Sequence, residues 1–369
     1  MPRVIGLLNL HNAPNLGKIC ENRALSSVSF LGRYAVCDIP LSNFANSGID
    51  SVGILVKRCP RSMIMHLEGK LFSSNSKLGK TSICYNEKYA NDPRYNTDIN
   101  NIIENKWFID ESNSKYIIIA SSHILYRMDF KDLIKAHEES GAKCTIAYKK
   151  ISTGKSEFIN HQILEIDENG YLRDIYRNKG LKEEVNVSLG TLIINTDVLL
   201  ELCQIAHNTS TLFTITDVIK YLIPKMEFNT YQYSGYLRAI SSLKNYLDYS
   251  LELLDFDVLK ELVSKDWPIY TKTHDTPPTR YLEDAWVRNS FISNGALIDG
   301  KVENSVICRD VKIGKNSIVR NSIVLSNTVI SENTILENVI VDKNAKILHV
   351  KELRGDKDNP LYIGQGDTV

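Results

Sequence analysis

The sequence has no net charge, no paired-cysteine motif and no long apolar run. Lys and Arg together number 44, as do Asp and Glu, which argues against nucleic acid or an anionic membrane as a partner. The seven cysteines are scattered and form no CxxC pair, so neither a disulfide framework nor a zinc site is expected. No window reaches the roughly 18 apolar residues of a membrane span, and the N-terminus shows no signal-peptide cleavage site. We therefore expect a cytoplasmic protein whose partners are small molecules or other proteins.

Short apolar runs alternate with amphipathic stretches up to about residue 270. This alternation is typical of strands and helices that build a largely parallel sheet. Buried strands are expected at 4–8, 51–56 and 115–119. The stretch 129–140 places apolar residues three or four positions apart and is followed by Gly141, so it predicts a surface helix with a left-handed cap.

A hairpin is expected where Asn169-Gly170 separates the segments 163–166 and 171–175, because this dipeptide tolerates positive φ. Three further helices are predicted from their apolar spacing. They cover residues 197–207, 216–222 and 243–254.

A second pattern begins after a proline-rich segment, 267–284, which is expected to be a linker. Apolar residues then recur every six positions, which predicts short strands coiled into a triangular, left-handed parallel β-helix. An ordinary run of short antiparallel strands is the alternative. The expected organisation is an α/β domain at 1–266 and a β-helix at 285–369. The two six-residue registers are Ile318, Val324, Ile330 and Leu336, and Ile323, Val329, Ile335, Val341 and Ile347.

The histidine content of the tail bears on its role. Coils of this kind serve mostly as oligomerisation surfaces or as acyltransferase sites built around a histidine. Only His349, near the end, is available here. An acyltransferase is therefore disfavoured.

Seven short motifs follow one another along nearly the whole chain. They are SFLGRY at 29–34, DIPLSN at 38–43, NSGI at 46–49, LYRMD at 125–129, SLG at 188–190, NTDV at 195–198 and WPIY at 267–270. In type and order they resemble the motifs of glucose-1-phosphate adenylyltransferases, the ADP-glucose pyrophosphorylases of glycogen and starch synthesis. The resemblance implies a Rossmann-like nucleotidyltransferase domain with a mixed, mostly parallel sheet, followed by the β-helix.

The loop after the first strand departs from this family. Active members have a glycine-rich loop with an Arg there, so that backbone N–H groups can approach the nucleotide triphosphate. Side chains at the glycine positions block that approach, and Pro14 removes a donor. The family's active-site Lys falls on Leu25, which we expect, with Leu10, to fill the vacated pocket. The altered loop positions are Leu10, His11 and Ala13 in place of glycine and Asn15 in place of Arg.

The implied magnesium site is altered as well. The two aspartates that hold Mg²⁺ in active members align with His123 and Ala239. Mg²⁺ prefers hard oxygen ligands, so imidazole and methyl groups are poor replacements. A new metal or acid–base pair formed by His11 and His123 is the alternative. No catalytic residue, metal or cofactor is therefore expected in this chain.

Some ligand-binding groups remain. The family's Glu-Lys pair for glucose 1-phosphate aligns with Asn178-Lys179, and Ser188 and Gly190 also match. A sugar-phosphate pocket is therefore expected in part. Arg33, whose family counterpart lies in an activator region, and a basic cluster are candidates for contact with a phosphorylated effector. The cluster contains Lys57, Arg58 and Arg61.

The resemblance is strongest to the regulatory, GlgD-type branch of the family. It implies an inactive subunit that joins a catalytic homologue, most simply in a hetero-tetramer, and changes that homologue's rate or effector response. Mg²⁺ and ATP would bind to the catalytic partner. A weakly active adenylyltransferase and a stand-alone sugar-phosphate sensor remain as alternatives.

Overall fold

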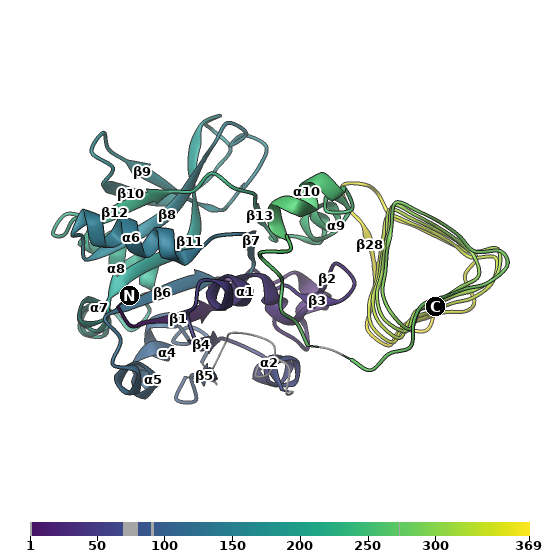
Figure 1. The fold of residues 1–369 in the computed structure, drawn as a ribbon, viewed down its shortest axis with the longest axis horizontal. Helices are drawn as coiled ribbons and strands as arrows, with labels where there is room; N and C mark the ends of the chain where they lie inside the picture. Colours follow the sequence, from purple (N-terminus) through teal and green to yellow (C-terminus); the bar gives the residue numbers. More distant parts are fainter. Residues whose placement is uncertain (1, 69–79, 90–91, 273) are drawn as a thin grey trace. The chain divides into compact units, whose positions relative to one another are not determined.

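The computed structural model describes residues 2–68, 80–89, 92–272 and 274–369. Its residue contacts divide the chain into two compact units (Figure 1). The first contains the chain up to Ala13 and from Ile39 to Ala239, and the second contains Pro14 to Asp38 and Ile240 to Val369. The segment 240–266, which the sequence analysis assigned to the α/β domain, therefore groups with the β-helix.

The first unit contains a nine-stranded mixed sheet. Strands run in the order β10-β9-β11-β6-β1-β4-β5, and β8 lies between β11 and β12. The central pairs are parallel, whereas β11 is antiparallel to β6, β8 and β9. The predicted strands 4–8, 51–56 and 115–119 are confirmed as β1, β4 and β6. The strands are β1 (Val4–Asn9), β4 (Ser51–Val56), β5 (Lys80–Tyr85), β6 (Tyr116–Ser121), β8 (Cys144–Ile151), β9 (Gln162–Ile166), β10 (Leu172–Arg177), β11 (Val185–Asn195) and β12 (Asn229–Gln232).

Helices cover this sheet, and a separate two-stranded sheet begins directly after β6 in the chain. An apolar core contains side chains from β1, β6, α4, α7 and α8. Phe44 of α1 packs on Gly6 of β1, where a Cβ would lie only 2.6 Å from the Phe44 ring. The helices are α1 (Asp38–Asn46), α2 (Pro60–Leu67), α4 (Asp98–Glu104), α5 (Lys106–Ser112), α6 (Phe130–Ser140), α7 (Thr196–Thr209) and α8 (Ile215–Leu222), and the small sheet pairs β7 (Ile124–Tyr126) with β13 (Leu237–Ala239).

Local signals explain why these elements begin and end where they do. The side chain of Asp129 caps α6 by accepting from Lys131 N, and Gly141 ends it at φ 63°. Gly170 at φ 83° closes the antiparallel hairpin of β9 and β10. The predicted helix at 129–140 and the predicted hairpin are therefore confirmed, as are the helices at 197–207, 216–222 and 243–254.

The second unit contains a left-handed parallel β-helix of three five-stranded sheets, which Figure 1 shows as a triangle. The run of antiparallel strands is thereby excluded. The first strand lies inside the predicted linker. The strands are β14 (Arg280–Tyr281), β15 (Trp286–Arg288), β16 (Phe291–Ile292), β17 (Leu297–Ile298), β18 (Lys301–Glu303), β19 (Val306–Ile307), β20 (Lys312–Ile313), β21 (Ile318–Arg320), β22 (Ile323–Val324), β23 (Val329–Ile330), β24 (Ile335–Glu337), β25 (Val339–Val341), β26 (Lys346–Ile347), β27 (Glu352–Arg354) and β28 (Leu361–Ile363).

The predicted six-residue registers are correct only in part. Ile318 pairs with Ile335, so this coil contains 335 − 318 = 17 residues, not 18. One side of the triangle is therefore one residue shorter than the other two. Residues spaced strictly six apart then point into the β-helix in one coil and away from it in the next. Ile318, Val329 and Ile335 are only half-buried for this reason. The buried interior positions are Val319, Val324, Ile330, Leu336, Val341 and Ile347.

The segment 14–38 packs within the second unit. Arg23 and Asp342, both buried, form an ion pair at 2.5 Å, and the Tyr362 hydroxyl donates to the same carboxylate at 2.5 Å. The Tyr246 hydroxyl donates to Ser29 O. The segment is thus fixed by buried polar contacts as well as by apolar packing. Its elements are η1 (Gly17–Cys20), η2 (Leu25–Ser27), β2 (Ser29–Phe30) and β3 (Tyr34–Ala35), and the unit also contains α9 (Leu243–Glu252) and α10 (Phe256–Leu262).

None of the helices in the part of the chain that the structure describes is long and apolar enough to cross a membrane.

Candidate functional site

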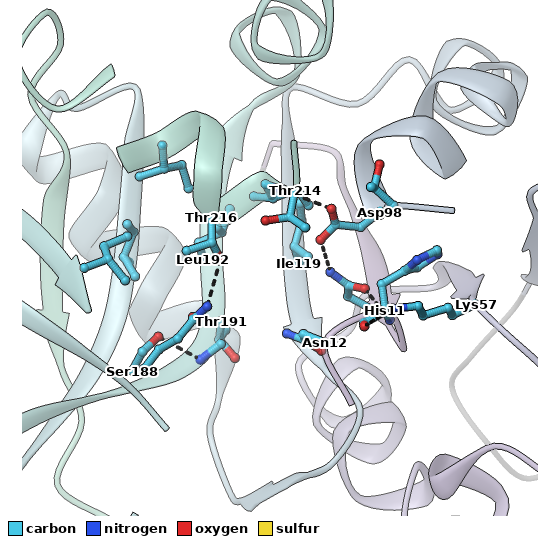
Figure 2. Close-up of a pocket in the computed structure, with 18 of the residues that line it drawn as sticks. His11, Asn12, Lys57, Asp98, Ile119, Ser188, Thr191, Leu192, Thr214 and Thr216 are labelled. Atoms are coloured by element: carbon cyan, nitrogen blue, oxygen red, sulfur yellow. Dashed lines mark hydrogen bonds between the residues drawn. The ribbon is translucent and has the colours of Figure 1, made fainter. Parts of the chain in front are cut away.

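A cavity of about 380 Å³ opens in the first unit at the carboxyl ends of the parallel strands (Figure 2). Asn9 is the last residue of β1, and Lys57 follows β4. Ser188 and Thr191 of β11 and Thr214 at the start of α8 line the opposite wall. In open α/β sheets, ligands bind at this edge. The cavity is therefore the candidate site.

The lining of the cavity is cationic. Among the described residues that line it, Lys57, Arg94 and Arg177 carry positive charge and Asp98 is the one carboxylate. Burial raises the pKa of Asp98 above its ordinary value, against the opposing effect of the hydrogen bonds that it accepts. The field in the cavity therefore favours an anionic ligand.

Asp98 connects three elements beneath the cavity. Its carboxylate accepts from Asn9 Nδ2 at 2.8 Å, from Ile215 N at 3.0 Å and from Ile99 N at 2.9 Å. These donors lie at the end of β1 and at the first turns of α8 and α4. Figure 2 shows Asp98 between the ends of β1 and α8. Asp98 is therefore placed to hold the walls of the cavity rather than to meet a ligand directly.

His11 is fixed in a neutral state. Asn101 Nδ2 donates to His11 Nε2 at 3.0 Å, which leaves His11 Nδ1 to donate to Asn96 O at 3.2 Å. Desolvation by burial lowers the pKa of His11 to about 3. The ring therefore carries no charge near neutral pH and cannot replace a cation that faces phosphates.

Three backbone N–H groups of the 10–13 loop are occupied by internal hydrogen bonds. Leu10 N donates to Leu55 O at 3.1 Å, Ala13 N donates to Leu10 O at 3.4 Å, and His11 N donates to Asn9 Oδ1 at 2.8 Å. Leu10 is buried and does not line the cavity, and its filling of the vacated pocket stays a prediction. Asn12 lines the cavity and donates to Ser121 Oγ at 2.7 Å.

Asn15 and Leu25 belong to the second unit. Asn15 Oδ1 accepts from Gly17 N at 3.1 Å within the same loop, and Leu25 is buried in η2. The structure thus gives both residues local structural roles in that unit.

The strand pair β7·β13 brings the two aligned metal positions together. Ala239 lies opposite Ile124, the residue that follows His123. His123 is buried, and desolvation lowers its pKa to about 3. Its Nδ1 has no hydrogen-bond partner among the described residues. No group of three metal-ligating side chains surrounds this place in the described chain. The residues present therefore do not fit Mg²⁺, which requires several oxygen ligands.

The alternative of a His11–His123 pair finds no support. Each ring has its own neighbours, Asn96 and Asn101 for His11, and His161 for His123 at 6.4 Å between ring centroids. Both imidazoles have a pKa of about 3, too low for acid–base catalysis near neutral pH.

The predicted sugar-phosphate residues are brought together in part. Ser188 and Gly190 line the cavity, and a Cβ at Gly190 would lie 2.0 Å from Ser121 Oγ, so only glycine fits there. Lys179 is exposed and does not line the cavity. Arg177, two residues earlier, lines it instead. A ligand in this cavity would therefore meet Arg177 rather than Lys179, and a sugar-phosphate contact of Lys179 stays a prediction.

The basic cluster is divided. Lys57 lines the cavity, and its Nζ donates to His11 O at 3.5 Å. Arg58 and Arg61 are exposed and do not line the cavity. Arg33 lies in the second unit, 5.4 Å from the Tyr34 ring.

Several lining residues escaped the sequence analysis. Most of them lie at the end of a strand or the start of a helix, where a polar side chain is the available signal, whereas Gln162 begins β9 and Arg94 lies in a turn before α4. They are Asn9, Arg94, Asp98, Gln162, Arg177, Thr214 and Thr216.

Comparison with known proteins places both units among characterised families. Residues 16–253 match the nucleotidyl transferase family model, and residues 277–359 match the model of the GlmU-like C-terminal hexapeptide region. The chain is 31% identical over 311 residues to the glucose-1-phosphate adenylyltransferase of Clostridioides difficile, with 82% of this chain and 79% of that protein covered. It is 30% identical over 353 residues to the glycogen biosynthesis protein GlgD of Bacillus subtilis, with 95% and 92% covered. Its identity to the glucose-1-phosphate adenylyltransferase of Mycoplasma mobile is 29% over 310 residues, with 82% and 80% covered.

Proposed function

Because the chain belongs to the glucose-1-phosphate adenylyltransferase family, we propose that it is a regulatory member that does not itself catalyse the transfer. A catalytic relative converts ATP and glucose 1-phosphate to ADP-glucose and pyrophosphate in glycogen biosynthesis, and binds the Mg²⁺ and ATP. This chain joins that relative in a hetero-tetramer. It changes the relative's rate or its response to a phosphorylated effector.

The chemistry at His123 and Ala239 is the observation that carries this proposal. His123 directly precedes β7, Ala239 of β13 lies opposite Ile124, and neither His123 nor Ala239 offers an oxygen to a hard cation. A transferring phosphoryl group needs its charge neutralised, usually by Mg²⁺ held on carboxylates. Loss of even one such stabilising group lowers turnover about 10²- to 10³-fold. Two losses in one place argue for negligible turnover.

The loop after β1 supports the same proposal. A phosphate cradle needs free backbone N–H groups that point at the ligand. The N–H groups of Leu10, His11 and Ala13 are all hydrogen bonded within the chain, and Pro14 has none. A triphosphate would have to compete with these bonds.

Three assays of ADP-glucose formation test the proposal: this chain alone, the catalytic relative alone, and the two co-expressed. We expect background activity from this chain and a changed turnover or activation curve for the pair. Magnesium-dependent ADP-glucose formation by the purified chain would favour a weakly active enzyme instead. An unchanged activation curve for the co-purified pair would remove the regulatory role.

A variant at His123 and Ala239 tests whether these two positions account for the expected lack of Mg²⁺ binding. The double substitution His123→Asp and Ala239→Asp restores two carboxylates at the aligned positions. We expect calorimetry to detect Mg²⁺ binding to this variant and none to the unmodified chain. Equal Mg²⁺ binding by both proteins would mean that the cation is held elsewhere and that the argument from these two positions fails.

A second candidate function, a stand-alone sugar-phosphate sensor, is favoured by the cationic cavity. Glucose 1-phosphate should bind without Mg²⁺, and Arg177→Ala should lower its affinity about tenfold through loss of one charge-assisted contact. Lys179→Ala is the matched control, because this lysine is exposed and does not line the cavity. A sensor would also remain separate from the catalytic relative, which size-exclusion chromatography of the co-expressed proteins would reveal.

A further inference from the structure

A second groove, of about 680 Å³, lies in the first unit along helix α7. Among the described residues, none that lines this α7 groove also lines the candidate site. Its volume lies within the range of small-molecule sites, about 300–1,000 Å³. The residues that α7 contributes are spaced three, four and seven positions apart, which places them on one face of the helix. They are Val198, Glu201, Leu202 and Ile205.

Two turns of the chain form the walls of the α7 groove. Helix α6 ends at Gly141 with φ 63°, and the chain then passes through Lys143 into β8. Beyond α8, Leu222 O accepts from Lys225 N at 2.8 Å and from Met226 N at 2.9 Å. This second turn brings Lys225 and Met226 to the groove. The walls are therefore held in place by backbone hydrogen bonds at the ends of two helices.

The floor of the α7 groove is apolar. Leu202 and Leu222 are buried and belong to the core of the first unit. Ile205 and Met226 are half-buried and pack against that core. Tyr221, which is 42% exposed, adds an aromatic ring. Covering this floor removes apolar surface from water, so the groove favours a ligand with a large apolar body.

Charges of both signs line the α7 groove without an ion-pair partner among the described residues. They belong to Lys143, Glu201 and Glu227. Lys225 is the other cation at the groove, and Tyr221 engages it. Lys225 Nζ lies 4.7 Å from the centroid of the Tyr221 ring and donates to the Tyr221 hydroxyl at 3.5 Å. One ammonium group and two carboxylates are thus left for a ligand.

We propose that the α7 groove binds a small zwitterion with a large apolar body, which is the chemistry of a free apolar amino acid. The carboxylate of the ligand pairs with Lys143, its ammonium group pairs with Glu201 and Glu227, and its apolar body covers the floor. An uncharged ligand would cover these charges without pairing them, which costs free energy. A ligand with a single charge would leave the charges of one sign in that condition. This site does not depend on the proposed regulatory function.

Calorimetry of the purified full chain with three related probes tests the proposal. The probes are L-phenylalanine, 3-phenylpropionate, which lacks the ammonium group, and phenethylamine, which lacks the carboxylate. We expect L-phenylalanine to bind. Each singly charged probe should bind about tenfold more weakly or worse, because it loses one charge-assisted contact.

Variants without charge assign the contacts to residues. Lys143→Met should weaken the binding of L-phenylalanine about tenfold and leave it no tighter than that of phenethylamine. The double substitution Glu201→Gln and Glu227→Gln should leave L-phenylalanine no tighter than 3-phenylpropionate. All three side chains are exposed, so we expect the variants to fold, which circular dichroism checks.

Two control variants locate the bound probe. Lys131→Met changes an exposed lysine of α6 that does not line the α7 groove, and Arg177→Ala removes a cation of the candidate site. We expect neither to alter the affinity for L-phenylalanine. No binding of L-phenylalanine at about 10 mM would assign the groove to a larger occupant and overturn the proposal. Equal binding of the three probes, or a loss with Arg177→Ala that matches the loss with Lys143→Met, would overturn it as well.

Discussion

Buried neutral histidines make the first unit sensitive to acid. Burial lowers the pKa of His11 and of His123 to about 3, whereas an unfolded chain protonates its histidines near pH 6.5. Between these limits the unfolded state binds more protons than the folded state. The stabilisation is therefore complete above about pH 6.5 and is lost as the pH falls towards 3.

We predict that the free energy of unfolding, measured with urea from about pH 7 to pH 5, falls with a slope that approaches about 1.4 kcal/mol per pH unit for each such histidine below about pH 6. His123→Asn should reduce the slope of the free energy of unfolding against pH by the contribution of one buried histidine. His349→Asn, at an exposed position, is the control and should leave the slope unaltered. An unchanged slope for His123→Asn would contradict the burial of a neutral ring at this position.

Asn101 illustrates how one amide can fix a loop. The two N–H groups of its Nδ2 are shared among three acceptors, His11 Nε2, Val56 O and Cys84 O. We predict that Asn101→Ala destabilises the chain by about 3 kcal/mol, because buried acceptors from three segments lose their donor. Asn12→Ala, which removes one bond to Ser121 Oγ, should cost about 1 kcal/mol. Chemical denaturation measures both, and equal losses would contradict a central role for Asn101.

At the scale of elements, helices and strands that follow a regular spacing of apolar residues were predictable from the sequence, whereas departures from that spacing were not. The strands β1, β4 and β6 and the helix α6 follow from apolar spacing and a glycine cap. The β-helix was also predictable, but its coil of 17 residues was not, because the shortened side depends on turns in which asparagine takes a left-handed conformation. Asn321 and Asn338 occupy such turns. Nothing in a six-residue pattern shows which side of the triangle is shorter.

The candidate site was less predictable than the fold. Ser188, Gly190 and Lys57 were identified from motifs or charge, and they line the cavity. Asp98 and Arg177 were missed, because their place depends on how α4 and β10 meet other elements distant in sequence. Local spacing carries no information on such long-range contacts.

The asparagine turns are themselves testable. Asn321 has φ 46°, and its Oδ1 accepts from Asn304 Nδ2 of the previous coil at 2.7 Å. Asn321→Ala should destabilise the chain by about 2 kcal/mol through backbone strain and the lost bond. Asn321→Gly keeps the backbone freedom and should cost about 1 kcal/mol. Thermal or urea unfolding distinguishes the two, and a glycine variant less stable than the alanine variant would refute the conformational argument.

At the scale of the whole molecule, the second unit depends on a buried ion pair. Asp342 accepts from Arg23 and Tyr362, and both members of the ion pair are buried. Removing one member leaves the other uncompensated, so Asp342→Asn should cost about 3–5 kcal/mol. The surface pair Glu337–Arg354 is the contrast, and Glu337→Gln should cost less than about 1 kcal/mol. Limited proteolysis should cut within residues 14–38 faster in Asp342→Asn only, and similar cleavage of both variants would disprove this role.

The path of the chain has a consequence for anyone who wishes to take the protein apart. The backbone leaves the first unit after Ala13, returns at Ile39 and leaves again after Ala239. No single scission can therefore liberate the β-helix with all of its packing partners. A chimera that exchanges only residues 240–369 would leave residues 14–38 packed against a β-helix from another protein. A chimera that keeps the native packing must therefore exchange residues 14–38 and 240–369 together.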